Sequence, residues 1–280
     1  MREIDLHVHS NHSDGTFSPT YIVEEAAKMG LRAIALTDHD NAGGCEEALE
    51  AGKKFGVEVV PGIEISTKYG VAVHILGYFV DFNSDFFLMI SDWIVDDRNE
   101  RNRKMCSLMQ ADGIDISYEK MLERFGDVIG RPHFARILME QGYAESINDA
   151  FDKYVEKGRK YYVPRTILPI ERAMKTIVRS GGLPVLAHPF QYRKTDKELR
   201  ELIEYIIPLG LKGMECRYSG YNAEQIAYLE SLADEYGLVK TGGSDYHGDN
   251  KPNQLGRGFG ELEVPYEWLE KLKALKNNNS

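Results

Sequence analysis

The sequence predicts an α/β protein with a mainly parallel sheet and a block of helices inserted into it. Strand-like and helix-like patterns alternate over residues 1–82 and again from about residue 167, which is typical of βα units. Seven segments have the character of strands. The length of 280 residues also suits an α/β barrel, because such barrels often form one unit of this size.

The first part of the chain contains four of the expected strands and two helices. Ser18 and Pro19 predict a helix start, since serine caps the first turn and proline fits within it, and Gly30 is expected to end that helix. Apolar spacing predicts a second helix from Cys45 to Phe55, closed by Gly56. The expected strands are the apolar runs 4–9, 33–39, 57–64 and 71–76.

The last part of the chain repeats this alternation. Helical spacing occurs before each of the three remaining apolar runs, so we expect further βα units here. The helices are expected at about 170–180, 197–207 and 222–236. The strands that follow them are expected at 183–188, 213–216 and 238–241.

The pattern between these parts, over residues 83–165, is helical only. Glycines separate the segments and predict their ends. The expected helices are 87–110, 118–125, 134–140 and 147–156. The sequence therefore predicts a barrel formed by 1–82 and 166–280, with 83–165 as an inserted lid. The insertion ends in a basic run, which is either a solvated surface or the border of a binding site and consists of Lys157, Arg159, Lys160 and Arg165.

Side chains that bind metals gather at the carboxyl ends of the expected strands. His7 and His9 are two residues apart, and residues at that spacing point to the same face of a strand; Asp245 and His247 repeat the spacing. Imidazole and carboxylate are the usual ligands of zinc, manganese and iron. A lone histidine is more often structural than a metal ligand. The prediction of more than one metal ion therefore rests on the repeated occurrence of such residues at several strand ends. The candidate ligands are His7, His9, Asp14, His39, Glu64, His74, His188, Asp245 and His247.

Composition narrows the classes of protein. The net charge of −10 argues against a protein that coats duplex nucleic acid, whereas a small anionic substrate at a metal site stays compatible with it. No apolar run reaches the roughly 18 residues that cross a membrane, and no signal peptide is recognisable. Cys45, Cys106 and Cys216 are scattered, which favours reduced thiols and a cytoplasmic location.

The series of strand-end motifs resembles the PHP (polymerase and histidinol phosphatase) family of metal-dependent phosphoesterases. This resemblance implies a distorted (β/α)7 barrel with its active site at the carboxyl rim of the strands. The matching segments, in chain order, are His7-Val8-His9-Ser10, His12-Ser13-Asp14-Gly15, Thr37-Asp38-His39-Asp40, Pro61-Gly62-Ile63-Glu64, Val73-His74-Ile75-Leu76-Gly77-Tyr78, Ala187-His188-Pro189 and Gly243-Ser244-Asp245-Tyr246-His247.

The resemblance also implies how two to three divalent ions (manganese, zinc or iron) would be held. One ion would be bound by His7, His9, Glu64 and Asp245. Glu64 would bridge to a second ion, which would also be bound by His74 and His188. A third ion would be bound by Asp14, His39 and His247. Of these residues, Glu64, Asp245 and His247 are expected to be catalytic, and Asp38 and Asp40 are expected to orient imidazoles.

Two further segments resemble the subgroup of nucleoside 3′,5′-bisphosphate phosphatases and 5′→3′ oligoribonucleases. They are Gly130-Arg131-Pro132-His133 and Tyr218-Ser219-Gly220-Tyr221. Arg131 is expected to act in catalysis and to bind substrate phosphate, because a guanidinium matches phosphate geometry. Alternatively it caps a helix that starts near Pro132, and the tyrosines only pack. The other expected substrate contacts are His133, Arg165 and Tyr218.

The expected activity is hydrolysis of phosphate from small nucleotides or 5′-phosphorylated RNA, with hydroxide generated at the ions. A small phosphorylated substrate is the expected partner, without duplex nucleic acid or membrane. Two alternatives stay open. A histidinol-phosphate phosphatase would share the metal motifs, and a PHP module without catalytic activity would serve as a scaffold.

Overall fold

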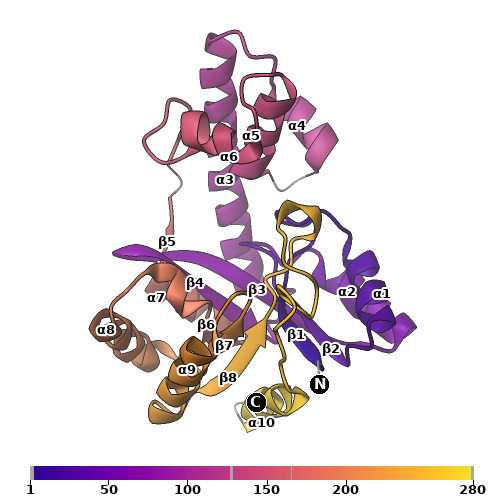
Figure 1. The fold of residues 1–280 in the computed structure, drawn as a ribbon, viewed down its shortest axis with the longest axis vertical. Helices are drawn as coiled ribbons and strands as arrows, with labels where there is room; N and C mark the ends of the chain where they lie inside the picture. The colour runs from indigo at the N-terminus through magenta and orange to yellow at the C-terminus, as the bar shows by residue number, and fades with distance from the viewer. Residues whose placement is uncertain (1–2, 127–128, 165, 279–280) are drawn as a thin grey trace.

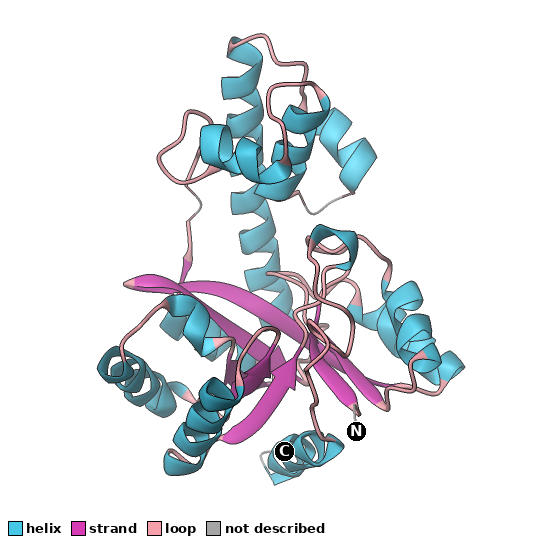
Figure 2. Cartoon of the chain, in the orientation of Figure 1, coloured by secondary structure: helices cyan, strands magenta, loops and turns pink. Residues whose placement is uncertain are grey.

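The computed structural model describes residues 3–126, 129–164 and 166–278, and its fold confirms the predicted distorted (β/α)7 barrel (Figures 1 and 2). The two end strands of the sheet approach each other, since the His9 amide donates to the Tyr246 carbonyl oxygen at 2.9 Å. The barrel is therefore nearly closed. The main path of the sheet runs through β1 (Ile4–Val8), β2 (Ala33–Leu36), β3 (Glu58–Tyr69), β4 (Val71–Tyr78), β6 (Leu183–Leu186), β7 (Gly213–Tyr218) and β8 (Val239–Gly243).

The sheet is mainly parallel, as expected, and β4 is the antiparallel exception. It pairs antiparallel with both β3 and β6. Gly70 lies between β3 and β4 with a φ of 70°, a conformation that suits glycine and lets the chain reverse in a tight hairpin without a crossover helix. A short strand that the sequence did not predict, β5 (Leu168–Pro169), pairs with β3 where the chain returns from the insertion.

Helices cover the sheet largely where the spacing predicted them. Ser18 caps α1 (Pro19–Lys28) by accepting from the Tyr21 amide, and Gly56 ends α2 (Cys45–Phe55) with a φ of 75°. The later helices are α7 (Ile170–Arg179), α8 (Asp196–Ile206) and α9 (Ala223–Glu235). Short 3₁₀ turns occupy Pro189–Tyr192, Ile207–Leu209 and Gly248–Asn250. An additional helix, α10 (Tyr266–Asn278), packs beside β8 and was not predicted.

The insertion stands over one end of the barrel on the long helix α3 (Asp85–Ala111) (Figure 1). It continues through α4 (Tyr118–Phe125), α5 (Arg131–Glu140), α6 (Ile147–Ala150) and a π-helical turn at Phe151–Val155. Met105, Met109 and Phe134 belong to a hydrophobic core of its own, whereas Phe87 and Ile94 at the base of α3 join the barrel core. These two cores support our proposal that residues 83–165 form a unit separate from the barrel. Helix α3 contributes side chains to both cores.

None of the described helices combines the length and the apolar character needed to cross a membrane.

Candidate active site

The structure brings all nine predicted ligand residues together in one cluster, although Glu64 and His74 lie within β3 and β4 and not at the strand ends that the sequence predicted. Three overlapping groups emerge, and within each group one ligand atom per residue lies within 4.8 Å of the others. The first group is His7, His9, Glu64 and Asp245. The second is His39, Glu64 and His74, and the third is His9, Asp14, His39 and His247. The grouping departs from the expected assignment at two points. His9 and His39 each take part in two groups, and His39 takes the place expected for His188 in the second group. His188 joins the cluster through Glu64 instead.

Glu64 lies at the centre of this cluster and is fully buried. Its Oε1 atom lies 2.9 Å from His74 Nδ1 and 2.9 Å from His188 Nε2. The other carboxylate oxygen, Oε2, lies 3.0 Å from His39 Nδ1 and 3.3 Å from His7 Nε2. Because its two oxygens face different sets of imidazoles, this carboxylate is suited to bridge two cations.

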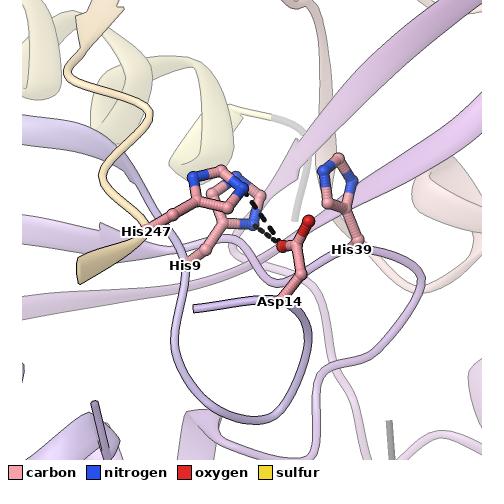
Figure 3. Close-up of side chains that lie close together, drawn as sticks. All are labelled: His9, Asp14, His39 and His247. Carbon is pink, nitrogen blue, oxygen red and sulfur yellow. Dashed lines mark ion pairs between the residues drawn. The ribbon is translucent and has the colours of Figure 1, made fainter. Parts of the chain in front are cut away.

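Asp14 forms a second focus of the cluster. Its Oδ1 atom lies 3.1 Å from His247 Nε2 and 4.0 Å from His9 Nδ1, and the rings of His9 and His247 stack with centroids 4.0 Å apart. Figure 3 shows the Asp14 carboxylate between this stacked pair and His39. Three imidazoles and one carboxylate thus face a common centre.

Several buried polar atoms of the cluster have no hydrogen-bond partner among the described residues. Leaving such atoms unpaired is costly, and these atoms are of the kind that divalent transition metals accept as ligands. The candidate ligand residues therefore fit divalent cations. The atoms are His7 Nε2, His9 Nδ1 and Nε2, Asp14 Oδ1, His39 Nδ1, Glu64 Oε2, His188 Nδ1 and His247 Nε2.

The electrostatics of the cluster keep its carboxylates ionised. Burial alone would raise the pKa of Glu64, but the nearby His39 and His7 outweigh it and hold that pKa well below its usual range. Burial is likewise outweighed at His39, where Glu64 and Asp14 raise the pKa to about 9. The same carboxylates that favour a proton on His39 would favour a metal cation in this cluster.

Asp245 is held in place by two neighbours, Tyr218 and Lys251, whose joint contact with it the sequence motifs did not predict. Its backbone has a φ of 54°, which is uncommon for a residue with a side chain. Tyr218 donates its hydroxyl to Asp245 Oδ2 at 2.7 Å, and Lys251 Nζ lies 2.8 Å from the same oxygen. Oδ1 is thereby turned toward His9 Nε2, at 3.1 Å. Tyr218, expected to contact substrate, thus contacts a candidate ligand.

The two aspartates that flank His39 connect it to neighbouring segments: Asp38 to the loop after β1, and Asp40 to β3 and α3. Asp38 accepts from the Ser10 amide at 2.8 Å and from the Ser13 hydroxyl, next to Asp14. Asp40 accepts from the Ser66 amide at 2.8 Å and from Arg98 at 3.2 Å. Asp38 thus holds the loop that carries Asp14. The expectation that Asp38 and Asp40 orient imidazoles stays a prediction.

A cavity of about 300 Å³ lies between the candidate ligands and the insertion. Asp14, His39 and His74 line it from the barrel. A smaller cavity of about 220 Å³ shares His39 and His74 with it and extends to Glu64, His188, Tyr218, Asp245 and Lys251. The insertion lines the larger cavity with Arg98, Arg101, Gly130, Arg131, Pro132, Tyr162 and Val163.

Three arginines give this cavity a cationic wall. Arg131, at the first position of α5, has a side chain that is 35% exposed and lies 3.4 Å from Glu156. Arg98 and Arg101 of α3 are almost fully buried, and Arg98 donates to the His39 carbonyl oxygen at 3.1 Å. Sequence reasoning missed these two arginines because a long, highly charged helix normally indicates a solvated face.

The other expected substrate contacts occupy different settings. His133 is buried, its Nδ1 accepts from the Gly130 amide at 2.9 Å, and its ring stacks on Phe125. Burial lowers the pKa of His133 to about 4, so the ring is neutral near pH 7 and caps α5. Arg165 lies outside the described residues. In the described part of the basic run, Lys157, Arg159 and Lys160 are exposed and do not line the cavity.

Comparison with known proteins agrees with this geometry. The PHP domain model matches residues 5–208. The chain is 33% identical over 267 residues to the 3′,5′-nucleoside bisphosphate phosphatase of Chromobacterium violaceum, covering 94% of this chain and 92% of that protein. It is 32% identical to the 5′-3′ exoribonuclease Rnm of Escherichia coli, covering 90% and 88% of the two chains.

A solved structure extends the similarity to three dimensions. The crystal structure of a protein from Bifidobacterium adolescentis, assigned as a metal-dependent phosphoesterase, superposes with a TM-score of 0.84 at 31% identity. The match covers 97% of this chain and 96% of that chain, so it includes the barrel and the insertion alike. The family match, the relatives and the shared fold lead to one conclusion: the chain belongs to the PHP-domain family of phosphoester hydrolases.

Proposed function

We propose that this protein hydrolyses phosphate esters of small nucleotides, either nucleoside 3′,5′-bisphosphates or short 5′-phosphorylated oligoribonucleotides on which it acts from the 5′ end. One observation carries the proposal. A single cavity joins the candidate metal ligands Asp14, His39 and His74 to the three arginines Arg98, Arg101 and Arg131. A substrate with two phosphates spaced by one nucleoside suits this arrangement. The names of the relatives from C. violaceum and E. coli support the same substrate classes.

The cluster of nine ligand residues would hold two or three divalent cations, with Glu64 shared between two of them. When bound, such cations activate water near neutral pH and neutralise the charge that develops on a phosphate ester. Imidazole and carboxylate ligands accept manganese, zinc and iron alike, so the ligand set does not choose among these metals.

The chain's own residues then divide into two roles. Around the scissile phosphate, Tyr218 and Lys251 fix the Asp245 carboxylate, so that Oδ1 stays directed at the cluster. Across the cavity, Arg131 together with Arg101 would neutralise the phosphate that is not cleaved, because guanidinium groups form charge-assisted hydrogen bonds with phosphate oxygens. Arg98 would hold the backbone of His39 in position through its hydrogen bond to the His39 carbonyl oxygen. His133 would hold the N-terminus of α5, and with it Arg131, in position.

A substrate panel with purified, metal-supplemented enzyme tests the proposal. It should contain a nucleoside 3′,5′-bisphosphate, a short 5′-phosphorylated RNA, histidinol phosphate and p-nitrophenyl phosphate. We expect the first two to give the highest kcat/KM. A preference for histidinol phosphate would establish the rival phosphatase activity instead.

The second alternative, a scaffold module without activity, is less favoured because all nine ligand positions are retained and converge. Elemental analysis of the purified protein separates the two readings. We expect bound divalent metal and hydrolysis that depends on it. A protein without bound metal and without metal-stimulated hydrolysis would support the scaffold. A cytoplasmic location remains a prediction, with the three free buried cysteines compatible with it.

A further inference from the structure

Glu215 of β7 is a fully buried carboxylate that contacts two candidate ligands at once. Its Oε1 atom lies 3.0 Å from His7 Nδ1, and its Oε2 atom accepts from the His188 backbone amide at 2.7 Å. The far side of the His7 ring faces the cluster, where Nε2 lies 3.3 Å from Glu64 Oε2. Glu215 and Glu64 therefore hold His7 from opposite edges of its ring.

The contact with Glu215 determines which nitrogen of His7 can bind a metal. Glu215 accepts from the His188 amide through Oε2, and a carboxylate oxygen in the same setting accepts from His7, so the contact places the His7 proton on Nδ1. The lone pair is then left on Nε2, which is buried and has no hydrogen-bond partner among the described residues. Carboxylates that hold the second nitrogen of a ligand histidine commonly fix its tautomer and its orientation.

The second oxygen of Glu215 fixes the backbone of another candidate ligand. His188 has a φ of 23°, outside the regions that residues with side chains normally occupy. A hydrogen bond from its amide to a buried carboxylate stabilises this conformation, and His188 Nε2 reaches Glu64 Oε1 at 2.9 Å. One carboxylate thus positions the side chain of His7 and the main chain of His188, whose rings stack with centroids 5.7 Å apart.

We propose that Glu215 is a positioning residue of the metal centre, which sets the Nδ1–H tautomer of His7 and aligns His188 with the same carboxylate. The proposal rests on the proposed metal-dependent function but is independent of the substrate. A signal for it was present in the sequence, since Glu215 is the one charged residue in the apolar run 213–216.

The variant Glu215→Gln separates positioning from packing, because glutamine has nearly the same shape. A carboxylate offers two acceptors, whereas an amide offers one acceptor and one donor. The His188 amide is a fixed donor, so the glutamine carbonyl should pair with it. The glutamine NH2 group then points at His7 Nδ1 and favours the Nε2–H tautomer, which cannot bind a metal through Nε2. Glu58→Gln is the matched control, because Glu58 begins β3 and pairs with Tyr266 and Lys273, away from the cluster.

The experiment uses zinc as the probe and no substrate. Competition with a chelator gives the zinc dissociation constants, and elemental analysis gives the zinc content. We expect Glu215→Gln to weaken the tightest zinc site by roughly 10- to 100-fold, the range typical of such supporting partners. Glu58→Gln should bind zinc as the wild type does. A lowered melting temperature of the metal-free protein with unchanged zinc binding would overturn the proposal, since a purely structural residue would behave in that way.

A second measurement decides the case even where Glu215→Gln does not fold. In the zinc-loaded wild type labelled with ¹⁵N-histidine, two-bond correlations identify the protonated nitrogen of His7. We expect the proton on Nδ1 and zinc on Nε2. A proton on Nε2 would refute the proposal directly. Because neither readout involves a phosphate ester, failure of the proposed substrate class would leave both results unchanged.

Discussion

Replacing Arg131 by alanine should weaken hydrolysis of a bisphosphate much more than hydrolysis of a simple aryl phosphate. Arg131 lines the cavity on the side of the insertion, opposite the candidate ligands. A bisphosphate would lose a charge-assisted hydrogen bond to its second phosphate, whereas p-nitrophenyl phosphate has no group there to lose. Hydrogen bonds to charged groups contribute about 1.5–3 kcal/mol.

The structure points to the lower part of that range. The Arg131 side chain is 35% exposed and already lies 3.4 Å from Glu156, so solvent and this partner reduce the net gain on binding. A loss of about 1.5–2 kcal/mol corresponds to a decrease in kcat/KM of roughly 10- to 30-fold. Most of it should appear as a higher KM for the bisphosphate.

Phosphate release from both substrates, measured for the wild type, Arg131→Ala and Arg159→Ala, checks this expectation. Arg159 is an exposed arginine of the same insertion and serves as the control for a lost surface charge. Equal decreases on both substrates would refute the second-phosphate role and place Arg131 at the scissile phosphate or in the scaffold. No decrease on either substrate would leave Arg131 as a surface residue at the start of α5.

Three further predictions concern the cluster and its surroundings. The variant Glu64→Gln should lose most of its bound metal, and its kcat/KM should fall at least about 100-fold, because a carboxylate shared by two cations is removed. The variant His247→Ala should loosen only a single ion. If elemental analysis and turnover of Glu64→Gln match the wild type, the bridging role is excluded. Chelation should lower the melting temperature, since ions present at 1,000 times their dissociation constant stabilise the native state by about 4 kcal/mol, and an unchanged melting curve would contradict this. His133 has a pKa of about 4 in the folded protein and about 6.5 in the unfolded chain. The unfolded state therefore binds more protons between these values, so the free energy of unfolding is highest above pH 6.5 and falls by up to roughly 3 kcal/mol as the pH drops from 6.5 to 4. Urea unfolding of the metal-free proteins should therefore show a flatter pH dependence for His133→Gln, and parallel curves for variant and wild type would disprove the shift.

The strands and the cluster of candidate ligand residues could be predicted because their signals are local. The two-residue spacing of His7 and His9 encodes the face of a strand, and apolar runs encode buried strands. The hairpin at Gly70 and the strand β5 depend on pairing partners that local patterns do not name. Arg98, Arg101 and Glu215 became visible as parts of the site only through tertiary contacts. The lone charge of Glu215 in an apolar run indicates a special role, but which residues it contacts depends on the elements that the fold places opposite it. Arg98 and Arg101 carry no local signal, because charged residues are common throughout their helix.

Helix α3 packs into both the barrel core and the insertion core, and this has a consequence for protein engineering. This helix enters the barrel core through Phe87 and Ile94, touches the His39 carbonyl through Arg98, and only then reaches the insertion core at Met105. A chimaera that exchanges the whole insertion would therefore also remove the Arg98 contact that supports the candidate ligand His39. Grafts that aim at new substrate preferences should keep the host helix through Arg101 and join the foreign segment beyond it.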